Sequence, residues 1–139
     1  MFNILRPLIF KFSPEVAHSL AIKALKLNNI PYSKPKDNHI LETTFCEKKL
    51  SSPIGVAAGF DKNAEVYNPL FNLGFGFVEV GTITPKPQFG NPKPRVFRLE
   101  EDEALINRLG FNNSGAEQIS QTIKENNKKG FLGINIGPN

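Results

Sequence analysis

Apolar positions recur at helical spacing in two consecutive segments at the start of the chain. In the first segment most apolar side chains fall on one helical face, and they belong to Phe2, Ile4, Leu5, Leu8, Ile9 and Phe12. Ser13, Pro14 and Glu15 are then typical of a helix start, as cap, first-turn residue and acid at the positive end of the dipole. The second apolar series is Val16, Ala17, Leu20, Ala21, Ala24 and Leu25. The pattern predicts two short amphipathic helices, at residues 3–11 and 14–28.

Beyond residue 38 the pattern changes to short β-rich runs that alternate with helical segments. The runs at 54–57, 77–80 and 131–136 are each followed closely by a glycine. Helical segments that begin at Asn68 and Ala116 fill the two intervals. Alternation of this kind is typical of a parallel sheet with right-handed crossovers. Antiparallel hairpins are predicted at two places, with strands at 43–45 and 48–50 and at 95–99 and 104–108.

Two further segments belong neither to the N-terminal helices nor to the alternating series. Residues 30–38 hold Pro31 and Pro35, and we interpret them as a linker between an N-terminal arm, 1–38, and a body, 39–139. Residues 84–113 form a long insertion after the second strand of the alternating series. Because insertions at the carboxyl ends of strands often cover the active site of β/α proteins, we expect this insertion to do so.

Three parallel strands and their helices do not close a barrel, which needs about 250 residues. An open three-stranded sheet would leave a flat apolar edge, which native proteins avoid. The chain is therefore either a small open α/β domain or the first part of a longer protein. We favour the second interpretation, because Gly137-Pro138-Asn139 adds no terminating element.

Composition and charge narrow the classes of protein. Among 139 residues, 40% are hydrophobic and 22% charged, which excludes bulk disorder. The single cysteine, Cys46, excludes an internal disulfide framework and a cysteine-rich zinc site, and we expect it to be a small buried hydrophobe. Six basic residues and one acidic residue lie up to Lys36, against eleven and twelve thereafter, so the basic character belongs to the arm. A uniformly basic nucleic-acid binder would not show this distribution.

The arm has two interpretations. Its helices either pack on the body or lie as a monotopic pair in a membrane interface. A secretory signal peptide is disfavoured, because Arg6, Pro7 and Lys11 interrupt the apolar run and no small-residue cleavage site follows. A mitochondrial transit peptide stays open but is weakly supported, since arginine and serine are sparse.

Candidate chemistry gathers at the carboxyl ends of the predicted parallel strands. At the first, Ala58 and Gly59 would let a flat ligand lie against the backbone, and Lys62 could neutralise an anion or stabilise a reduced, anionic ring. Thr82 and Asn135 place polar groups at the ends of the other two. A tight turn with a surface lysine, and satisfied polar groups at strand ends, are the alternatives.

Residues 106–113 concentrate amide side chains beside Gly110. Amides both donate and accept hydrogen bonds, so they can hold a planar ligand that carries carbonyl and N–H groups. A turn with asparagine caps explains the same string equally well.

Five strings of this chain, taken in order, resemble the dihydroorotate dehydrogenases, most closely their quinone-dependent, membrane-associated class 2. The strings are residues 57–62, 74–88, 90–99, 106–113 and 133–139. Any one string alone is weakly specific, whereas five in order at family-like spacing are very specific. The resemblance extends over nearly the whole chain.

The resemblance implies a flavin mononucleotide (FMN) enzyme on a (β/α)8 TIM barrel, an α/β fold of which this chain would hold about the first three β/α units. By resemblance, the residues that bind the flavin are Ala58, Gly59, Phe60, Asp61, Lys62, Thr82 and Asn135. Those that bind dihydroorotate or orotate are Lys62, Asn107, Arg108, Leu109, Gly110 and Phe111. The implied reaction takes a proton from C5 and a hydride from C6 of dihydroorotate and passes the electrons to a quinone, within UMP biosynthesis.

The arm favours class 2, because the soluble class 1 enzymes lack such an extension. In class 2 the two helices form a membrane-bound lid and a quinone tunnel, and His18 and Arg98 match positions that line the quinone site. The implied protein is a peripheral, monomeric protein on the cytoplasmic face of a bacterial inner membrane, with the mitochondrial inner membrane as the alternative. No nucleic-acid partner and no metal are expected.

The family's catalytic base is expected beyond residue 139, so none is assigned within this chain. We therefore expect the isolated chain neither to bind flavin tightly nor to turn over. The alternatives are a class 1 or other FMN-dependent barrel oxidoreductase, and a non-catalytic membrane-binding fragment.

Overall fold

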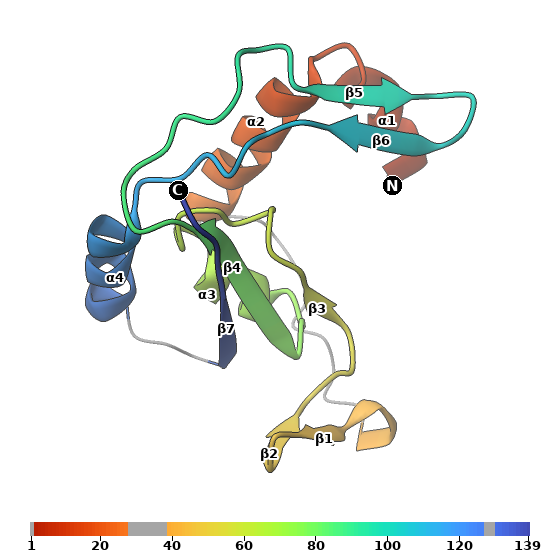
Figure 1. Ribbon diagram of the computed structural model, residues 1–139. Helices are drawn as coiled ribbons and strands as arrows, with labels where there is room; N and C mark the ends of the chain where they lie inside the picture. The colour runs from red at the N-terminus through yellow and green to blue at the C-terminus, as the bar shows by residue number, and fades with distance from the viewer. Residues whose placement is uncertain (1, 28–38, 127–129) are drawn as a thin grey trace.

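The computed structural model describes residues 2–27, 39–126 and 130–139. The elements in chain order are α1 (Phe2–Ile9), α2 (Pro14–Lys26), the 3-10 turn η1 (His39–Leu41), β1 (Thr43–Phe45), β2 (Lys48–Leu50), β3 (Gly55–Val56), α3 (Tyr67–Asn72), β4 (Phe77–Ile83), β5 (Val96–Leu99), β6 (Ala104–Asn107), α4 (Ala116–Glu125) and β7 (Phe131–Ile136). Figure 1 shows strands and helices mixed along the chain, which is the α/β class expected from the sequence.

A parallel sheet with the order β3-β4-β7 organises the body. Strand β4 lies in the centre, with Gly55 opposite Phe77 on one side and Leu132 opposite Val78 on the other. Helices α3 and α4 follow β3 and β4 in sequence, so the predicted strand–helix alternation is confirmed.

The apolar core lies against one face of this sheet. Val78 and Val80 of β4 are completely buried, because alternate residues of a strand point to the same face. The other buried members of the cluster are Ile22, Leu25, Ala64, Val66, Tyr67, Leu70, Ile83 and Ile119. Residues of α2, α3, α4 and β4 therefore share one core.

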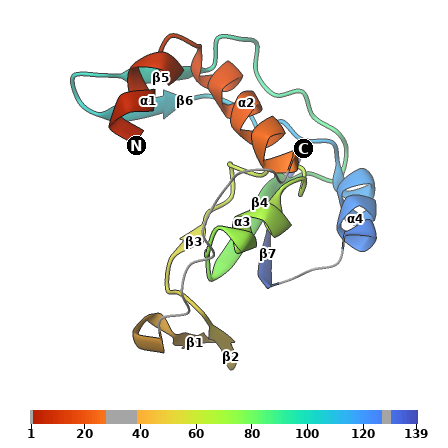
Figure 2. The same cartoon turned by 180° about the vertical axis from the view of Figure 1, so that it is seen from behind.

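The hairpin β5–β6 stands apart from the parallel sheet, beside the N-terminal helices (Figures 1 and 2). Val96 pairs with Asn107 at its open end, and an isolated bridge between Gln88 and Asn113 extends the pairing of the two connecting segments. The insertion predicted at 84–113 is thus a long two-stranded segment. It leaves the sheet after β4 and returns to it before α4.

The two predicted N-terminal helices are present, each ending about two residues earlier than expected. Ser13 occupies the cap position of α2 and Pro14 its first turn, but the predicted serine cap is wrong in one respect: the side chain makes no capping hydrogen bond. Ile22 and Leu25 enter the core, whereas Val16 and Leu20 are exposed. Within the described residues, no helix has the length and apolar character needed to cross a bilayer.

The structure corrects two local expectations. Cys46 is exposed, in the turn between β1 and β2 at φ +48°, so the prediction of a small buried residue is wrong. Helix α3 begins at Tyr67 after a Val66 cap, one residue before the predicted start at Asn68. The buried carboxylate of Asp61 binds the N–H groups of the two residues before Tyr67. The predicted linker, 30–38, lies outside the described residues.

Candidate active site

The loop that follows β3 is attached to the end of β4 by two backbone hydrogen bonds. The Gly59 N–H donates to the Gly81 carbonyl at 2.8 Å, and the Gly81 N–H donates to the Asp61 carbonyl at 3.0 Å. Gly59 adopts φ +105°, and a Cβ placed on it would meet no atom within 4 Å. Open space above a fixed backbone is what a flat ring system needs, so this loop fits the expected flavin.

Asp61 directs its carboxylate into the loop that leads to α3. Its two oxygens accept the N–H groups of Glu65 and Val66, both at 2.8 Å. The side chain is 1% exposed, and this burial raises the pKa of Asp61 although the two N–H donors oppose the rise. Asp61 therefore stabilises the start of α3, and its backbone carbonyl holds β4.

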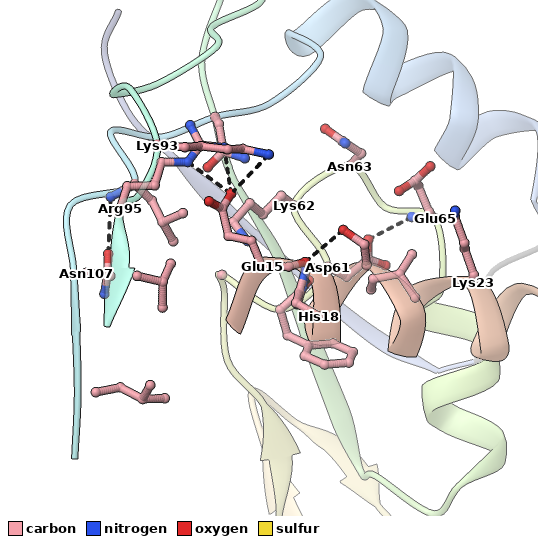
Figure 3. A pocket seen from close by; sticks show the side chains of 18 of the residues that line it. Glu15, His18, Lys23, Asp61, Lys62, Asn63, Glu65, Lys93, Arg95 and Asn107 are labelled. Atoms are coloured by element: carbon pink, nitrogen blue, oxygen red, sulfur yellow. Dashed lines mark hydrogen bonds and ion pairs between the residues drawn. The ribbon is translucent and has the colours of Figure 1, made fainter. Parts of the chain in front are cut away.

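Lys62 reaches into a cleft of about 680 Å³ between α2, the β3–α3 loop and the β5–β6 hairpin. Figure 3 shows its side chain among charged and amide groups from all three elements. Burial lowers the pKa of Lys62; Glu15 and Asp61 act against this shift, and Arg95 adds to it. Within the described part of the chain, its ammonium makes no hydrogen bond and no ion pair. A half-buried cation without a bonded partner is a ready site for an anion.

One wall of the cleft is held by Arg95, which is 7% exposed. Its Nε and Nη2 donate to Glu15 Oε1 at 3.0 and 2.9 Å, and its Nη1 donates to the carbonyls of Phe89 and Asn91. Lys93 Nζ lies 3.9 Å from the same Glu15 oxygen. Figure 3 shows these groups converging on Glu15. The ion pair joins α2 to the hairpin across 80 residues of sequence.

His18 and Arg98, the two expected quinone-site residues, both join the N-terminal helices to the body. His18 Nε2 donates to the Phe60 carbonyl at 2.7 Å, and its ring meets the Phe60 ring edge-on. Arg98 Nη1 donates to the Phe12 carbonyl at 2.8 Å, and the guanidinium lies 4.5 Å from the centre of the Phe10 ring. His18 lines the cleft, whereas Arg98 is not among its lining residues.

The expected substrate segment, 107–111, divides between the cleft and its surroundings. Asn107 and Leu109 line the cleft. Arg108 donates instead to the Pro94 carbonyl at 3.1 Å, and the Gly110 carbonyl accepts from Gln88 at 2.8 Å. Phe111 is half-exposed at φ +50°. The structure thus gathers two of the five residues with Lys62 and turns Arg108 away.

The next two residues, both asparagines, behave in opposite ways. Asn113 is 8% exposed and fully bonded: its Oδ1 accepts from Thr84 and Gly115, and its Nδ2 donates to Thr84 and Phe111. Asn112 lines the cleft, and its Oδ1 is buried without a hydrogen-bond partner in the described structure. A buried acceptor without a donor is costly unless a ligand or water supplies one.

Thr82 and Asn135, from the ends of β4 and β7, bond directly to each other. Thr82 Oγ1 donates to Asn135 Oδ1 at 2.6 Å, and Asn135 Nδ2 donates to Glu79 Oε1 at 3.2 Å. The Ala58 N–H points to the other Glu79 oxygen at 3.5 Å. Three expected flavin residues thus meet around one carboxylate.

Sequence reasoning did not single out four residues that the structure brings into the site. These are Glu15, Glu79, Arg95 and Asn112. The sequence pattern indicates only a helix-start acid at Glu15 and only the start of a strand at Arg95. Asn112 carried a signal, because it belongs to the amide-rich string at 106–113. Glu79 had one too, as a charged residue inside a β-rich run.

Comparisons with known proteins agree on one family. The family model described as dihydroorotate dehydrogenase matches residues 40–139. A Rhodospirillum rubrum protein named dihydroorotate dehydrogenase (quinone) is 51% identical over 133 residues, covering 96% of this chain and 36% of its own length. An Erythrobacter litoralis protein of the same name is 50% identical over 140 residues, covering 100% of this chain and 40% of its own length.

Solved structures give the same result. The crystal structure of Eimeria tenella DHODH in complex with ferulenol has a TM-score of 0.84 and 43% identity, over 91% of this chain and 36% of that chain. This chain therefore spans about two fifths or less of the length of these relatives. The match of the family model over most of the chain, with the agreement in sequence and fold, shows that the chain belongs to the dihydroorotate dehydrogenase family.

Proposed function

We propose that this chain forms the N-terminal helices and the first part of the flavin and substrate site of a quinone-dependent dihydroorotate dehydrogenase. The protein that carries it would oxidise dihydroorotate to orotate in the synthesis of UMP. The observation that supports this most strongly is Lys62, a half-buried ammonium without a bonded partner in the described structure, at the edge of the cleft that Asn107 and Asn112 also line.

The cleft offers groups that complement a dihydroorotate molecule. The Lys62 ammonium would bind the carboxylate, since a charged pair in a partly desolvated site is stronger than in water. The unpaired Oδ1 of Asn112 would accept a ring N–H, and Asn107 would contribute an amide that both donates and accepts. Binding would thus give the Lys62 ammonium and the Asn112 oxygen the partners that they lack in the described structure.

The expected cofactor is a flavin, which we propose to be FMN. When bound, it would supply the acceptor for the hydride that leaves C6 of the substrate. The residues that would hold it are Ala58, Gly59, Phe60, Asp61, Lys62, Thr82 and Asn135. The open space above Gly59 and the polar groups of Thr82 and Asn135 support this assignment. The base that takes the C5 proton is expected beyond residue 139.

Within a longer protein, β3, β4 and β7 would be the first three parallel strands of a (β/α)8 TIM barrel. Residues 39–139 would then be the front of the flavin-binding barrel, and residues 1–38 an arm that precedes it. The parallel order β3-β4-β7 and the helices on one face of the sheet support this proposal.

The arm would attach the protein to a membrane surface and admit a quinone. Large apolar side chains of α1, α2 and the turn between them are exposed, namely Leu5, Leu8, Ile9, Phe12, Val16 and Leu20. Their combination with basic side chains such as Arg6 and Lys11 is typical of an interfacial helix. His18 and Arg98 would line the quinone path. We propose a monomer on the cytoplasmic face of a bacterial inner membrane, with a mitochondrial inner membrane as the alternative.

The test compares the isolated 139-residue chain with the complete gene product that contains it. We expect the complete product to carry flavin absorbance and to reduce a quinone with dihydroorotate, and the isolated chain to do neither. A complete product without flavin or dihydroorotate oxidation would contradict the proposal. Activity with a soluble acceptor in preference to quinone would favour class 1, and vesicle binding without flavin would favour a non-catalytic membrane protein.

A further inference from the structure

Glu79 is a charged residue in the middle of the central strand, where neighbouring residues are apolar. Val78 and Val80 on either side of it are fully buried in the core. Since side chains alternate along a strand, Glu79 points to the opposite face of the sheet. It is half-buried there, and it is not among the expected site residues. A carboxylate held in this position calls for an explanation, because its partial burial is costly unless its oxygens are bonded.

The bonds of Glu79 reach both neighbouring strands. Its partner in register on β7 is Gly133, which has no side chain, so the carboxylate can extend along the sheet face to Asn135 two residues further on. Its Oε1 accepts from Asn135 Nδ2 at 3.2 Å, and its Oε2 faces the Ala58 N–H at 3.5 Å. One side chain thus connects the ends of β3, β4 and β7.

These bonds decide which way the Asn135 amide points. An ionised carboxylate only accepts hydrogen bonds, so the amide must present Nδ2 to Glu79. Its Oδ1 is then directed to Thr82, whose hydroxyl hydrogen it accepts at 2.6 Å. With the hydroxyl hydrogen engaged, Thr82 Oγ1 keeps only acceptor capacity, and Asn135 keeps one Nδ2 hydrogen as a donor.

We propose that Glu79 is a positioning residue of the flavin site: it orients the Asn135 amide and the Thr82 hydroxyl so that the strand ends present one donor and one acceptor. The inference rests on the proposed function and deepens it. Glu79 itself need not touch the cofactor, because it acts through two residues that do. Its negative charge also lies in the site, so it opposes further negative charge on a reduced ring.

The test uses the complete gene product with Glu79→Gln. Glutamine keeps the length of the side chain but can present a donor to Asn135, so the amide loses its fixed orientation. We expect the dissociation constant of FMN, measured by fluorescence titration of the apoprotein, to rise about tenfold. We expect the midpoint potential of the bound flavin to become more positive, because a negative charge is removed. Glu100→Gln, in the exposed acidic turn, is the matched control and should change neither.

A second variant separates position from charge and guards against misfolding of the first. Glu79→Asp keeps the charge but is one methylene shorter, so it should weaken FMN binding with a smaller change in potential. Unchanged FMN affinity and potential in both folded variants would overturn the inference while the proposed function stands. A wild-type product that binds no FMN would overturn the proposed function and this inference with it.

Discussion

The core and the cleft of this molecule differ in how completely their groups are satisfied. In the core, Val78, Val80 and Ile119 are apolar and 0–1% exposed, and the buried Asp61 beside it has both oxygens bonded. In the cleft, the Lys62 ammonium and the Asn112 oxygen have no bonded partner in the described structure. Groups with packed or bonded partners stabilise the fold, whereas groups without such partners are available to bind a ligand.

The first substitution removes a completely buried apolar side chain from the core. Ile119→Ala removes a side chain of α4 that is 1% exposed, and we expect a loss of about 3 kcal/mol in the free energy of unfolding, because a cavity remains. Urea denaturation measures it. Leu105→Ala, at a residue that is 66% exposed, is the control and should cost less than about 0.5 kcal/mol. Equal losses in the two variants would contradict the assignment of the core.

Lys62→Met removes the unpaired ammonium of the cleft. We expect the Michaelis constant for dihydroorotate in the complete gene product to rise about a hundredfold, equivalent to about 3 kcal/mol, because the anion loses its charged partner. The free energy of unfolding should stay the same or increase, since a half-buried charge is removed. Lys48→Met, at an exposed lysine of β2, should leave the Michaelis constant unchanged. A clear loss of unfolding free energy with an unchanged Michaelis constant would show that Lys62 stabilises the fold and does not bind the substrate.

Arg95→Met removes a hydrogen-bonded guanidinium that lines the same cleft as the unpaired groups of Lys62 and Asn112. Removing the guanidinium leaves Glu15 and two carbonyls without their donor, and we expect a loss of about 2–3 kcal/mol in unfolding free energy. A double-mutant cycle with Glu15→Gln measures the coupling across the cleft. Arg108→Met, at an exposed arginine, should cost less than about 0.5 kcal/mol. Additive effects of the two cleft substitutions would show that α2 and the hairpin are not energetically joined.

Two adjacent asparagines differ in the same way, because Asn112 has an unpaired buried oxygen and Asn113 is fully bonded. Asn112→Leu removes the buried acceptor without a partner, and we expect a gain of about 1 kcal/mol in unfolding free energy with weaker substrate binding. Asn113→Leu removes a side chain with four hydrogen bonds and should cost about 2 kcal/mol or more. Thermal unfolding of both variants measures the difference. Destabilisation by Asn112→Leu would mean that its oxygen is satisfied.

The stability of the protein should also depend weakly on pH through Lys62. Because the pKa of Lys62 is lowered in the folded protein, the unfolded chain holds this proton more strongly at pH values between the lowered pKa and 10.5. The stability contributed by this site should therefore rise with pH across that window, while affinity for an anionic substrate falls. Parallel titrations of wild type and Lys62→Met isolate the contribution. An identical pH dependence in both would show that Lys62 titrates as an ordinary surface lysine.

Much of the fold could be predicted because it depends on neighbours in the chain. The amphipathic spacing of the first two helices, the β-rich runs around Val78 and Ile134, and the turn residues between them are local signals. Those signals failed at the start of α3, where a side chain four and five residues away in the chain binds the backbone. Helix α3 starts at Tyr67 because the Asp61 carboxylate takes the two preceding N–H groups, and no spacing rule anticipates that bond.

The expected site residues differ in how far local sequence patterns indicate them. Lys62, Thr82 and Asn135 stand beside glycines or at strand ends, where sequence patterns indicate ligand chemistry. The roles of Glu15 and Arg95 could not be found in this way, because they meet only when α2 packs on the hairpin 80 residues later. The exposed Cys46 shows the opposite error, since the burial preferred by its residue type was overridden by its place in a turn.

Residues close together in the chain are enough to predict the order of elements, the basic and amphipathic character of the arm, and the motifs of the family. Tertiary packing, in contrast, determines which polar groups have bonded partners. It paired Glu15 with Arg95, linked Glu79 to Asn135, and left Lys62 and Asn112 facing one cleft. Hydrogen bonding and desolvation depend on distances in space, and segments far apart in the chain set these distances together when the chain folds.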